Sequence, residues 1–100
     1  MEINVQFVKM QTSEAMEAYV RKKMEKLGNK HDSIIRADVF YKLENDPKGK
    51  GKICEIQLSQ YGPKIFASSN NKYFEEATDK AIGDLKKLLN RRKGKMKPYL

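Results

Sequence analysis

The residues with the clearest chemical meaning are the cations of the stretch DLKKLLNRRKGKMK, residues 84–97. Seven Lys and Arg side chains follow Asp84, and no acidic side chain follows it. The chain of 100 residues has a net charge of +8, so these seven cations account for all but one of its excess positive charges, and residues 1–85 have a net charge of only +1. Cations at this density bind polyanions, and nucleic acid is a more frequent partner than an anionic membrane. Helix-dipole and solubility effects explain one or two cations at a helix end, but not seven.

An earlier helical stretch also separates its charges. At about 100° per residue, three lysines share one flank: Lys22, Lys26 and Lys30. Lys23 lies at the border of the apolar face, where its stem can pack while its ammonium group reaches solvent. The acids fall on the opposite flank: Glu14, Glu17 and Glu25. Arg21 is four residues from Glu17 and from Glu25, so we expect it to pair with them.

The C-terminal helical stretch has a comparable cationic stripe. Lys80, Lys87 and Arg91 share one flank, which Asp84 interrupts, and we expect these cations to project into a groove edged by the first helix. Lys86 lies on the other flank with Glu75 and Asp79 and is expected to contribute less to binding. The candidate nucleic-acid-binding residues are Lys22, Lys23, Lys26, Lys80, Lys87, Arg91, Arg92 and Lys95.

Other chemistry is thinly represented in the sequence. His31 and Cys54 are the only histidine and the only cysteine, and two such residues far apart predict neither a metal site nor a catalytic thiol. We expect Cys54 to be a small core residue. The KGKGK stretch is a hairpin tip rather than a phosphate-binding loop. Four aromatic residues could stack on bases, but their spacing fits the core or a sheet surface better: Tyr41, Phe66, Tyr73 and Phe74. The sequence therefore predicts no enzyme, no metal or other cofactor, and no small-molecule substrate.

The hydrophobic periodicity predicts six elements. Alternating residues indicate strands at 3–9, 34–44, 52–60 and 65–69. Helical spacing indicates one helix capped by Thr12 and ended by Gly28, and another over 72–92. The inward residues of the strands are expected to be Ile3, Val5, Phe7, Ala37, Val39, Tyr41, Leu43, Cys54, Ile56 and Leu58. Those of the last helix are Phe74, Ala77, Ala81, Ile82, Leu85, Leu88 and Leu89.

This order, β-α-β-β-β-α, predicts an α+β two-layer sandwich with both helices on one face of a four-stranded, mostly antiparallel sheet. A ferredoxin-like fold would need a further strand after the second helix, and only GKMKPYL remains there. We expect one domain over residues 1–92 and a mobile basic tail over 93–100. The sequence shows neither a signal peptide nor a membrane-spanning run, and its single cysteine fits a reducing compartment, so we expect a cytoplasmic location.

Taken together, these stretches resemble the ribosome hibernation promoting factor family, which includes the ribosome-associated inhibitors and has been labelled sigma-54 modulation protein. The resemblance rests on INVQFVKMQTSEAMEAYVRKKMEKL, two hairpins, and KYFEEATDKAIGDLKKLLNRRKGK, and it covers residues 1 to about 95. In the final helix, AIGDLKKLLNRRK stands against a family pattern close to AIDKLERQLRKxK. The chain is most similar to the short form, which has neither a second, dimerising domain nor an extended C-terminal tail.

The resemblance implies a fold and a function. Family members fold as β-α-β-β-β-α and bind the small ribosomal subunit, its rRNA and possibly ribosomal proteins, in the channel for mRNA and tRNA. They silence idle ribosomes in stationary phase and stress. The family's basic positions carry over to Lys23, Lys26, Lys87 and Arg91. Asp84 and Leu88 depart from the lysine and glutamine that are frequent in the family, and we expect nearby cations to compensate: Arg92, Lys93 and Lys95.

Two other classes of protein remain open at this point. A DNA- or dsRNA-binding regulator would use the same basic edge, although the lysine-rich loop of a double-stranded RNA-binding domain is not evident in SSNNKYF. A small acylphosphatase-like enzyme would use a related scaffold, but the missing last strand argues against it.

Overall fold

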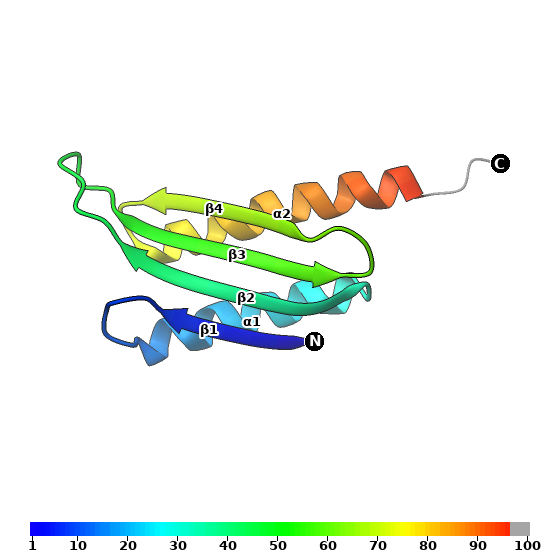
Figure 1. The fold of residues 1–100 in the computed structure, drawn as a ribbon, viewed down its shortest axis with the longest axis horizontal. Coiled ribbons are helices and arrows are strands. Elements are labelled where there is room, and N and C mark those ends of the chain that lie inside the picture. Colours follow the sequence, from blue (N-terminus) through cyan, green and yellow to red (C-terminus); the bar gives the residue numbers. More distant parts are fainter. Residues whose placement is uncertain (97–100) are drawn as a thin grey trace.

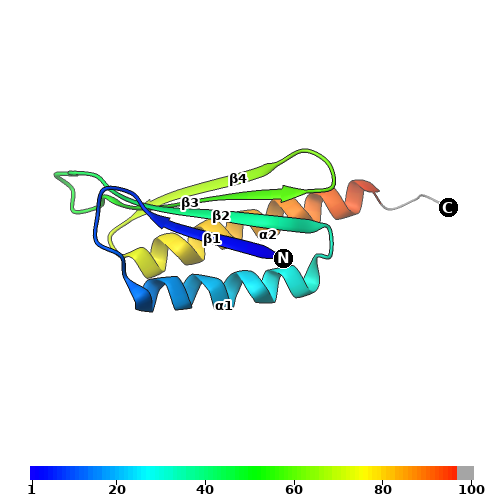
Figure 2. The same ribbon diagram turned by 60° about the horizontal axis from the view of Figure 1, so that its bottom comes forward.

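The protein consists of one sheet covered on one face by two helices (Figures 1 and 2). The computed structural model describes the backbone of residues 1–96 and the side chains of residues 1–91. The elements in chain order are β1 (Glu2–Phe7), α1 (Glu14–Lys30), β2 (Ile34–Leu43), β3 (Lys52–Gln60), β4 (Ile65–Asn71) and α2 (Phe74–Met96). This architecture confirms the predicted α+β two-layer sandwich and its element order.

The strands lie in the sheet in chain order, β1-β2-β3-β4. β1 pairs with β2 in parallel, whereas β2–β3 and β3–β4 are antiparallel. Parallel neighbours need a crossover connection, and α1 supplies it, while the antiparallel pairs are joined by short turns. The β2–β3 hairpin projects at one end of the molecule and the end of α2 extends beyond the sheet at the other (Figure 1). Among the described residues, no helix is long and apolar enough to cross a membrane.

Helix α1 begins one residue later than the sequence predicted. Ser13 is the N-cap, with an extended backbone (φ −112°), and its Oγ accepts a hydrogen bond from the Met16 amide at 3.2 Å. The prediction of Thr12 was therefore wrong. Adjacent Thr and Ser can both cap a helix, Ser somewhat better, and the backbone places Ser13 at the cap position.

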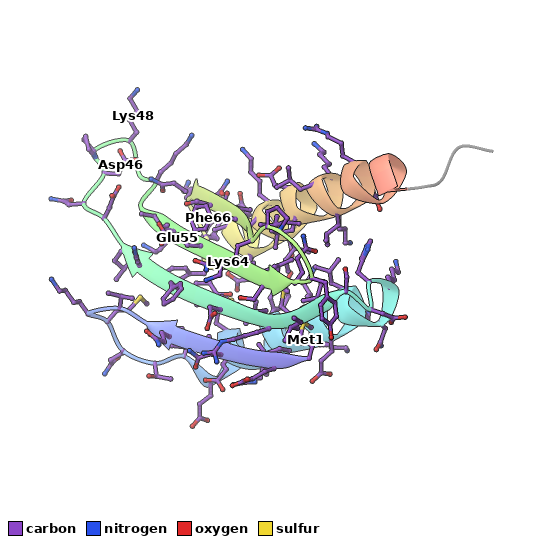
Figure 3. The ribbon with its side chains drawn as sticks, turned by 45° about the vertical axis from the view of Figure 1, so that its right-hand side comes forward. Met1, Asp46, Lys48, Glu55, Lys64 and Phe66 are labelled. Carbon is purple, nitrogen blue, oxygen red and sulfur yellow. The ribbon has the colours of Figure 1, made fainter. Side chains whose placement is uncertain are left out.

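The end of α1 also differs from the prediction. Gly28 was expected to stop the helix in a left-handed conformation, but α1 continues through it to Lys30. A Cβ atom at Gly28 would lie 2.7 Å from Cε of Met1, so the glycine gives the Met1 side chain room beside the helix. Figure 3 shows Met1 at the start of β1, next to the end of α1.

Helix α2 begins at Phe74, two residues after the predicted start, and β4 is correspondingly longer. At the other end, α2 continues to Met96 rather than stopping at Arg92. Residues 93–96, which were expected to begin a basic tail, are therefore helical. The rest of that segment, residues 97–100, lies outside the described residues.

The core fills the space between the sheet and both helices. The fully buried side chains include Val39, Tyr41, Cys54, Ile56, Leu58, Ala77, Ala81 and Leu85, all of them predicted to face inward. The rings of Phe7 and Phe74 pack on Tyr41, with centroids 5.2 and 5.4 Å away. Leu43 is the exception, since it ends β2 beside the exposed hairpin and is 50% exposed. The periodic pattern therefore identified the core residues, but it did not show that the helices no longer cover the sheet at the end of β2.

The face of the sheet that points away from the helices, here called the open face, pairs its charges internally. Arg36 donates from Nε to Asp38 Oδ1 at 3.0 Å and from Nη1 to Glu2 Oε1 at 3.2 Å. Lys42 Nζ lies 2.8 Å from Glu55 Oε1 across the β2–β3 pair. Cations and acids of the open face are thus matched within β1, β2 and β3.

Candidate nucleic-acid interface

A groove of about 450 Å³ separates α1 from α2 and opens to solvent. Leu27 and Ile82, both buried, lie at its apolar base. The polar lining from α1 is Lys23, Lys26, Asn29 and Lys30. The lining from α2 is Asp79, Gly83 and Lys86. We refer to this feature as the inter-helix groove.

One ion pair spans the inter-helix groove. The carboxylate of Asp79 accepts from Lys23 Nζ at 2.7 Å and from the hydroxyl of Tyr19, also at 2.7 Å. The Lys23 ammonium group lies 4.9 Å from the centre of the Tyr19 ring, which adds a cation–π contact. Since Tyr19 and Lys23 belong to α1 and Asp79 to α2, this cluster links the two helices at the surface of the groove.

The cluster alters the ionisation of its members. Burial by itself would raise the pKa of Asp79, but the hydrogen bonds from Lys23 and Tyr19 outweigh it and hold the pKa below its usual value. The hydrogen bond to Asp79 raises the pKa of Lys23 and also that of Tyr19. Asp79 therefore stays anionic and Lys23 stays cationic throughout the neutral range, and the charge of each is largely matched by the other.

The remaining cations of the groove are not matched in this way. Among the residues whose side chains are described, Lys26, Lys30 and Lys86 form no ion pair. All three are exposed, and they reach the groove from both helices. After Lys23 and Asp79 cancel, the lining retains three positive charges, which attract an anion such as a phosphate.

A second hollow, of about 380 Å³, lies on the other flank of α2 beside the edge strand β4. We call it the outer hollow. Its lining from α2 is Asp84, Lys87, Leu88 and Arg91, and its lining from β4 is Phe66, Ala67 and Ser68. Phe66 belongs to the open face and is 54% exposed (Figure 3).

The two hollows correct the sequence-based placement of the cations on α2. Lys87 and Arg91 were expected to face α1, but they line the outer hollow, whereas Lys86 lines the inter-helix groove. The spacing of residues fixes the angle between two side chains about the helix axis. It does not say which flank meets α1, because that depends on the position of α2 beneath β3 and β4. Lys87 and Arg91 stay together with Asp84, and Lys86 stays with Asp79, but the assignment of these two flanks to the groove was reversed.

The other predicted binding residues are distributed over the helices. Lys22 is exposed on α1 and Lys80 on α2, and neither is among the residues that line the two hollows. Arg92 and Lys95 belong to the last turns of α2, where side chains lie outside the described set. Lys86 was set aside in the sequence-based analysis, and no spacing in the sequence could have assigned it to the inter-helix groove, because helix packing decides which flank faces α1.

The predicted pairing of Arg21 is confirmed for one of its two partners. Arg21 donates from Nε to Glu17 at 3.1 Å and from Nη1 to the carbonyl oxygen of Ile3, also at 3.1 Å. Among the described side chains, no ion pair joins Arg21 to Glu25, since the guanidinium group turns toward β1 instead.

Cys54 is buried in the core, as predicted, and this burial raises the pKa of its thiol to about 11. A thiol with so high a pKa carries little thiolate at neutral pH and is a poor nucleophile.

Within the described part of the chain, no cluster of three or more His, Cys, Asp or Glu residues is arranged to hold a metal ion.

The fold and these hollows define a class of protein: a small basic α+β domain whose helical layer presents cations. The chain belongs to the family described as Sigma 54 modulation protein / S30EA ribosomal protein, whose family model matches residues 3–97. This finding confirms the resemblance to the ribosome hibernation promoting factor family. A comparison with curated proteins found no match to this chain.

Solved structures of similar fold cover almost the whole chain. A ribosomal subunit interface protein from Coxiella burnetii has a TM-score of 0.80 at 20% identity, over 94% of this chain and 99% of that one. The N-terminal domain of Protein Y from Thermus thermophilus has a TM-score of 0.78 at 24% identity, over 91% of this chain and 98% of that one. At these identities, the likenesses establish the fold.

Proposed function

We propose that this protein binds the small ribosomal subunit through rRNA phosphates and inhibits translation in idle cells by occupying the channel for mRNA and tRNA. Membership of a ribosomal protein family supports the choice of partner. The name of one structural neighbour, a ribosomal subunit interface protein, points the same way.

The observation that carries the proposal is the position of the cations. On the open face, Arg36 and Lys42 are paired with acids. The helical layer instead presents Lys26, Lys30 and Lys86 in one hollow and Lys87 and Arg91 in the other. Phosphate contacts supply most of the affinity in sequence-independent binding to nucleic acid. The helical layer is therefore the proposed contact surface, and the exposed Lys22 and Lys80 extend it, as would Arg92 and Lys95 near the end of α2.

The proposed mechanism requires no chemical step. A protein that fills the mRNA and tRNA path blocks both ligands sterically, and its effect depends only on affinity and position. Translation is restored when the protein dissociates, so the inhibition should be reversible by competition. This expectation separates occlusion from chemical inactivation of the ribosome.

The test is a cell-free bacterial translation reaction supplied with the purified protein. Peptide synthesis should fall, and an excess of mRNA together with initiator tRNA should partly restore it. Inhibition that neither competitor relieves would argue against occlusion of the channel. The Lys87→Glu, Arg91→Glu double variant serves as the matched control and should inhibit less at the same concentration.

A binding assay addresses the alternative of a general nucleic-acid-binding regulator. Sedimentation with purified small subunits, large subunits and free duplexes of RNA or DNA should place the protein with the small subunit. Equal binding to a bare duplex would instead favour a general DNA- or dsRNA-binding regulator.

A further inference from the structure

Helix α2 contains a glycine that the fold does not need. Gly83 is absent from the positive-φ residues, so its backbone suits any amino acid. A Cβ atom built on Gly83 would meet no atom within 4 Å, so close packing does not require a glycine either. Glycine is less favourable than alanine inside a helix, so this position gives up helix stability and leaves bare backbone at the inter-helix groove.

The bare backbone at Gly83 lies among cations. Lys86 follows it by three residues, on the next turn of α2, and Lys26 and Lys30 face it from α1. Glycine positions of this kind let another backbone approach closely, and a strand of nucleic acid has a backbone that carries one negative charge per nucleotide. A side chain at residue 83 would stand in the path of such a strand.

Asp79 already places one negative charge in the groove. Its carboxylate attracts Lys23 and the Tyr19 hydroxyl by direct hydrogen bonds, and Lys86 stabilises its charge from a greater distance. Asp79 therefore has two effects on a second anion. It keeps Lys23 matched, and it repels an incoming phosphate across the same groove.

We propose that the inter-helix groove seats a phosphodiester of the RNA backbone among Lys26, Lys30 and Lys86, with Gly83 as the point of close approach and Asp79 as a built-in competitor. That the RNA is ribosomal follows from the proposed function. The phosphodiester-binding site, here called the seat, is inferred from the residues of the groove alone. Asp79 is a positioning residue: it holds Lys23 in an ion pair across the groove, and its negative charge limits the affinity for a second anion.

Salt dependence of binding to purified small subunits provides the first test. A phosphate contact contributes a log–log slope of about −0.9, so the wild type should lose about 3.5-fold more affinity than Lys86→Gln between about 50 and about 200 mM salt. Lys30→Gln should behave in the same way. Lys48→Gln, at the exposed tip of the β2–β3 hairpin (Figure 3), is the matched control and should retain the wild-type slope. Wild-type slopes for Lys86→Gln and Lys30→Gln would overturn the proposal.

Two further variants test the competitor and the point of close approach. Asp79→Asn keeps a hydrogen-bond acceptor for Tyr19 but releases Lys23, so it should bind small subunits more tightly and with a slope about one unit steeper. Gly83→Gln should bind more weakly although it favours the helix, and its thermal unfolding midpoint reports whether it is folded. Weaker binding by Asp79→Asn, or unchanged binding by a folded Gly83→Gln, would contradict the proposed roles.

A ribosome-free measurement separates the seat from the proposed partner. The backbone amide resonance of Gly83 should shift when a short single-stranded RNA is added to the wild type or to Lys48→Gln, and should shift much less in Lys86→Gln. If the wild type fails to bind small subunits but this pattern holds, the seat stands and the proposed function fails. If the wild type binds small subunits and the pattern is absent, the function stands and the seat is elsewhere.

Discussion

Lys23 of α1 and Asp79 of α2 form an ion pair with 2.7 Å between Nζ and Oδ1, although the two residues are far apart in sequence. Lys23 is one of the positions that the family resemblance marks as a phosphate contact. In this chain its ammonium group already has an anionic partner within the protein. The availability of a cation for RNA therefore depends on its neighbours, and the inter-helix groove holds both matched and unmatched lysines.

The outer hollow provides a prediction about binding. Lys87→Glu and Arg91→Glu should each weaken binding to the small subunit, because each removes one cation from the hollow and adds an acid beside Asp84. Reversal of a phosphate contact should also flatten the salt slope by about one unit. Affinities measured over a salt series would check this. Lys50→Glu in the exposed β2–β3 hairpin has the same change of charge, and an equal loss there would indicate a general charge effect.

Leu85 anchors α2 to the sheet, and its loss should destabilise the fold. Its side chain is fully buried, so Leu85→Ala should leave a cavity and lower the free energy of unfolding by about 2–5 kcal/mol. Urea denaturation followed by circular dichroism would measure the change. Lys87→Ala, two residues away on the exposed side of α2, should shift the midpoint little. Equal shifts for the two variants would mean that the buried face has been assigned incorrectly.

A buried hydrogen-bond chain links β2 to α2. Thr78 Oγ1 donates to the carbonyl oxygen of Phe74 at 2.7 Å, so the Tyr41 hydroxyl must donate to Thr78 across another 2.7 Å. Thr78→Val removes the acceptor and leaves the buried Tyr41 hydroxyl unpaired, which should cost about 1–3 kcal/mol.

The double variant separates this hydrogen bond from packing. Tyr41→Phe combined with Thr78→Val removes both polar partners, so it should recover part of the stability lost in Thr78→Val alone. Urea midpoints of the three variants would form the test. Strictly additive losses would show that the two hydroxyl groups do not interact energetically.

Alkaline pH should destabilise the protein through its buried acids. Burial raises the pKa of Cys54 from 9.0 to about 11, and burial together with Cys54 raises the pKa of Tyr41 above its usual 10.0. Well below pH 9 both groups are neutral in the folded and unfolded chains, so their contribution to stability is complete. Above pH 9 the unfolded chain loses protons first, so unfolding becomes easier.

The loss attributable to Cys54 should approach about 2–3 kcal/mol by pH 11, and Tyr41 should extend it to higher pH. Unfolding free energies measured at intervals above pH 8 would reveal the slope. Cys54→Ala is the control, since it should flatten the first part of the slope whatever its effect at neutral pH. An unchanged slope in that variant would rule out the thiol as the cause.

The sequence predicted the fold because its apolar spacing was regular. Ala77, Ala81 and Leu85 recur on one side of the helix and all three are buried, as the period of 3.6 residues requires. The ends of the elements were predicted less accurately. Ser13 and Thr12 both offer a hydroxyl group that can cap the helix, and Gly28 makes room for the Met1 side chain instead of ending the helix. Local patterns thus predicted which residues are buried, but not every contact at the ends.

The candidate site was predicted only in part. The basic flanks were evident from sequence, but the flank of α2 that faces α1 depends on how the helices lie across the sheet. Lys86 therefore lies in the inter-helix groove, where Lys87 was predicted, and Lys87 lies in the outer hollow. The matching of Lys23 by Asp79 had no local signal, because the two residues approach each other only when both helices are packed.

The unequal charge of the two layers has a consequence for the approach to a partner. The open face matches Arg36 and Lys42 with neighbouring acids, whereas the helical layer carries the unmatched lysines. A polyanion should therefore attract the helical layer more strongly than strands β1, β2 and β3 of the open face. This difference steers the protein helix-first before contact, which increases the fraction of collisions that are productive. Added salt should slow association by weakening this steering, independently of its effect on the bound state.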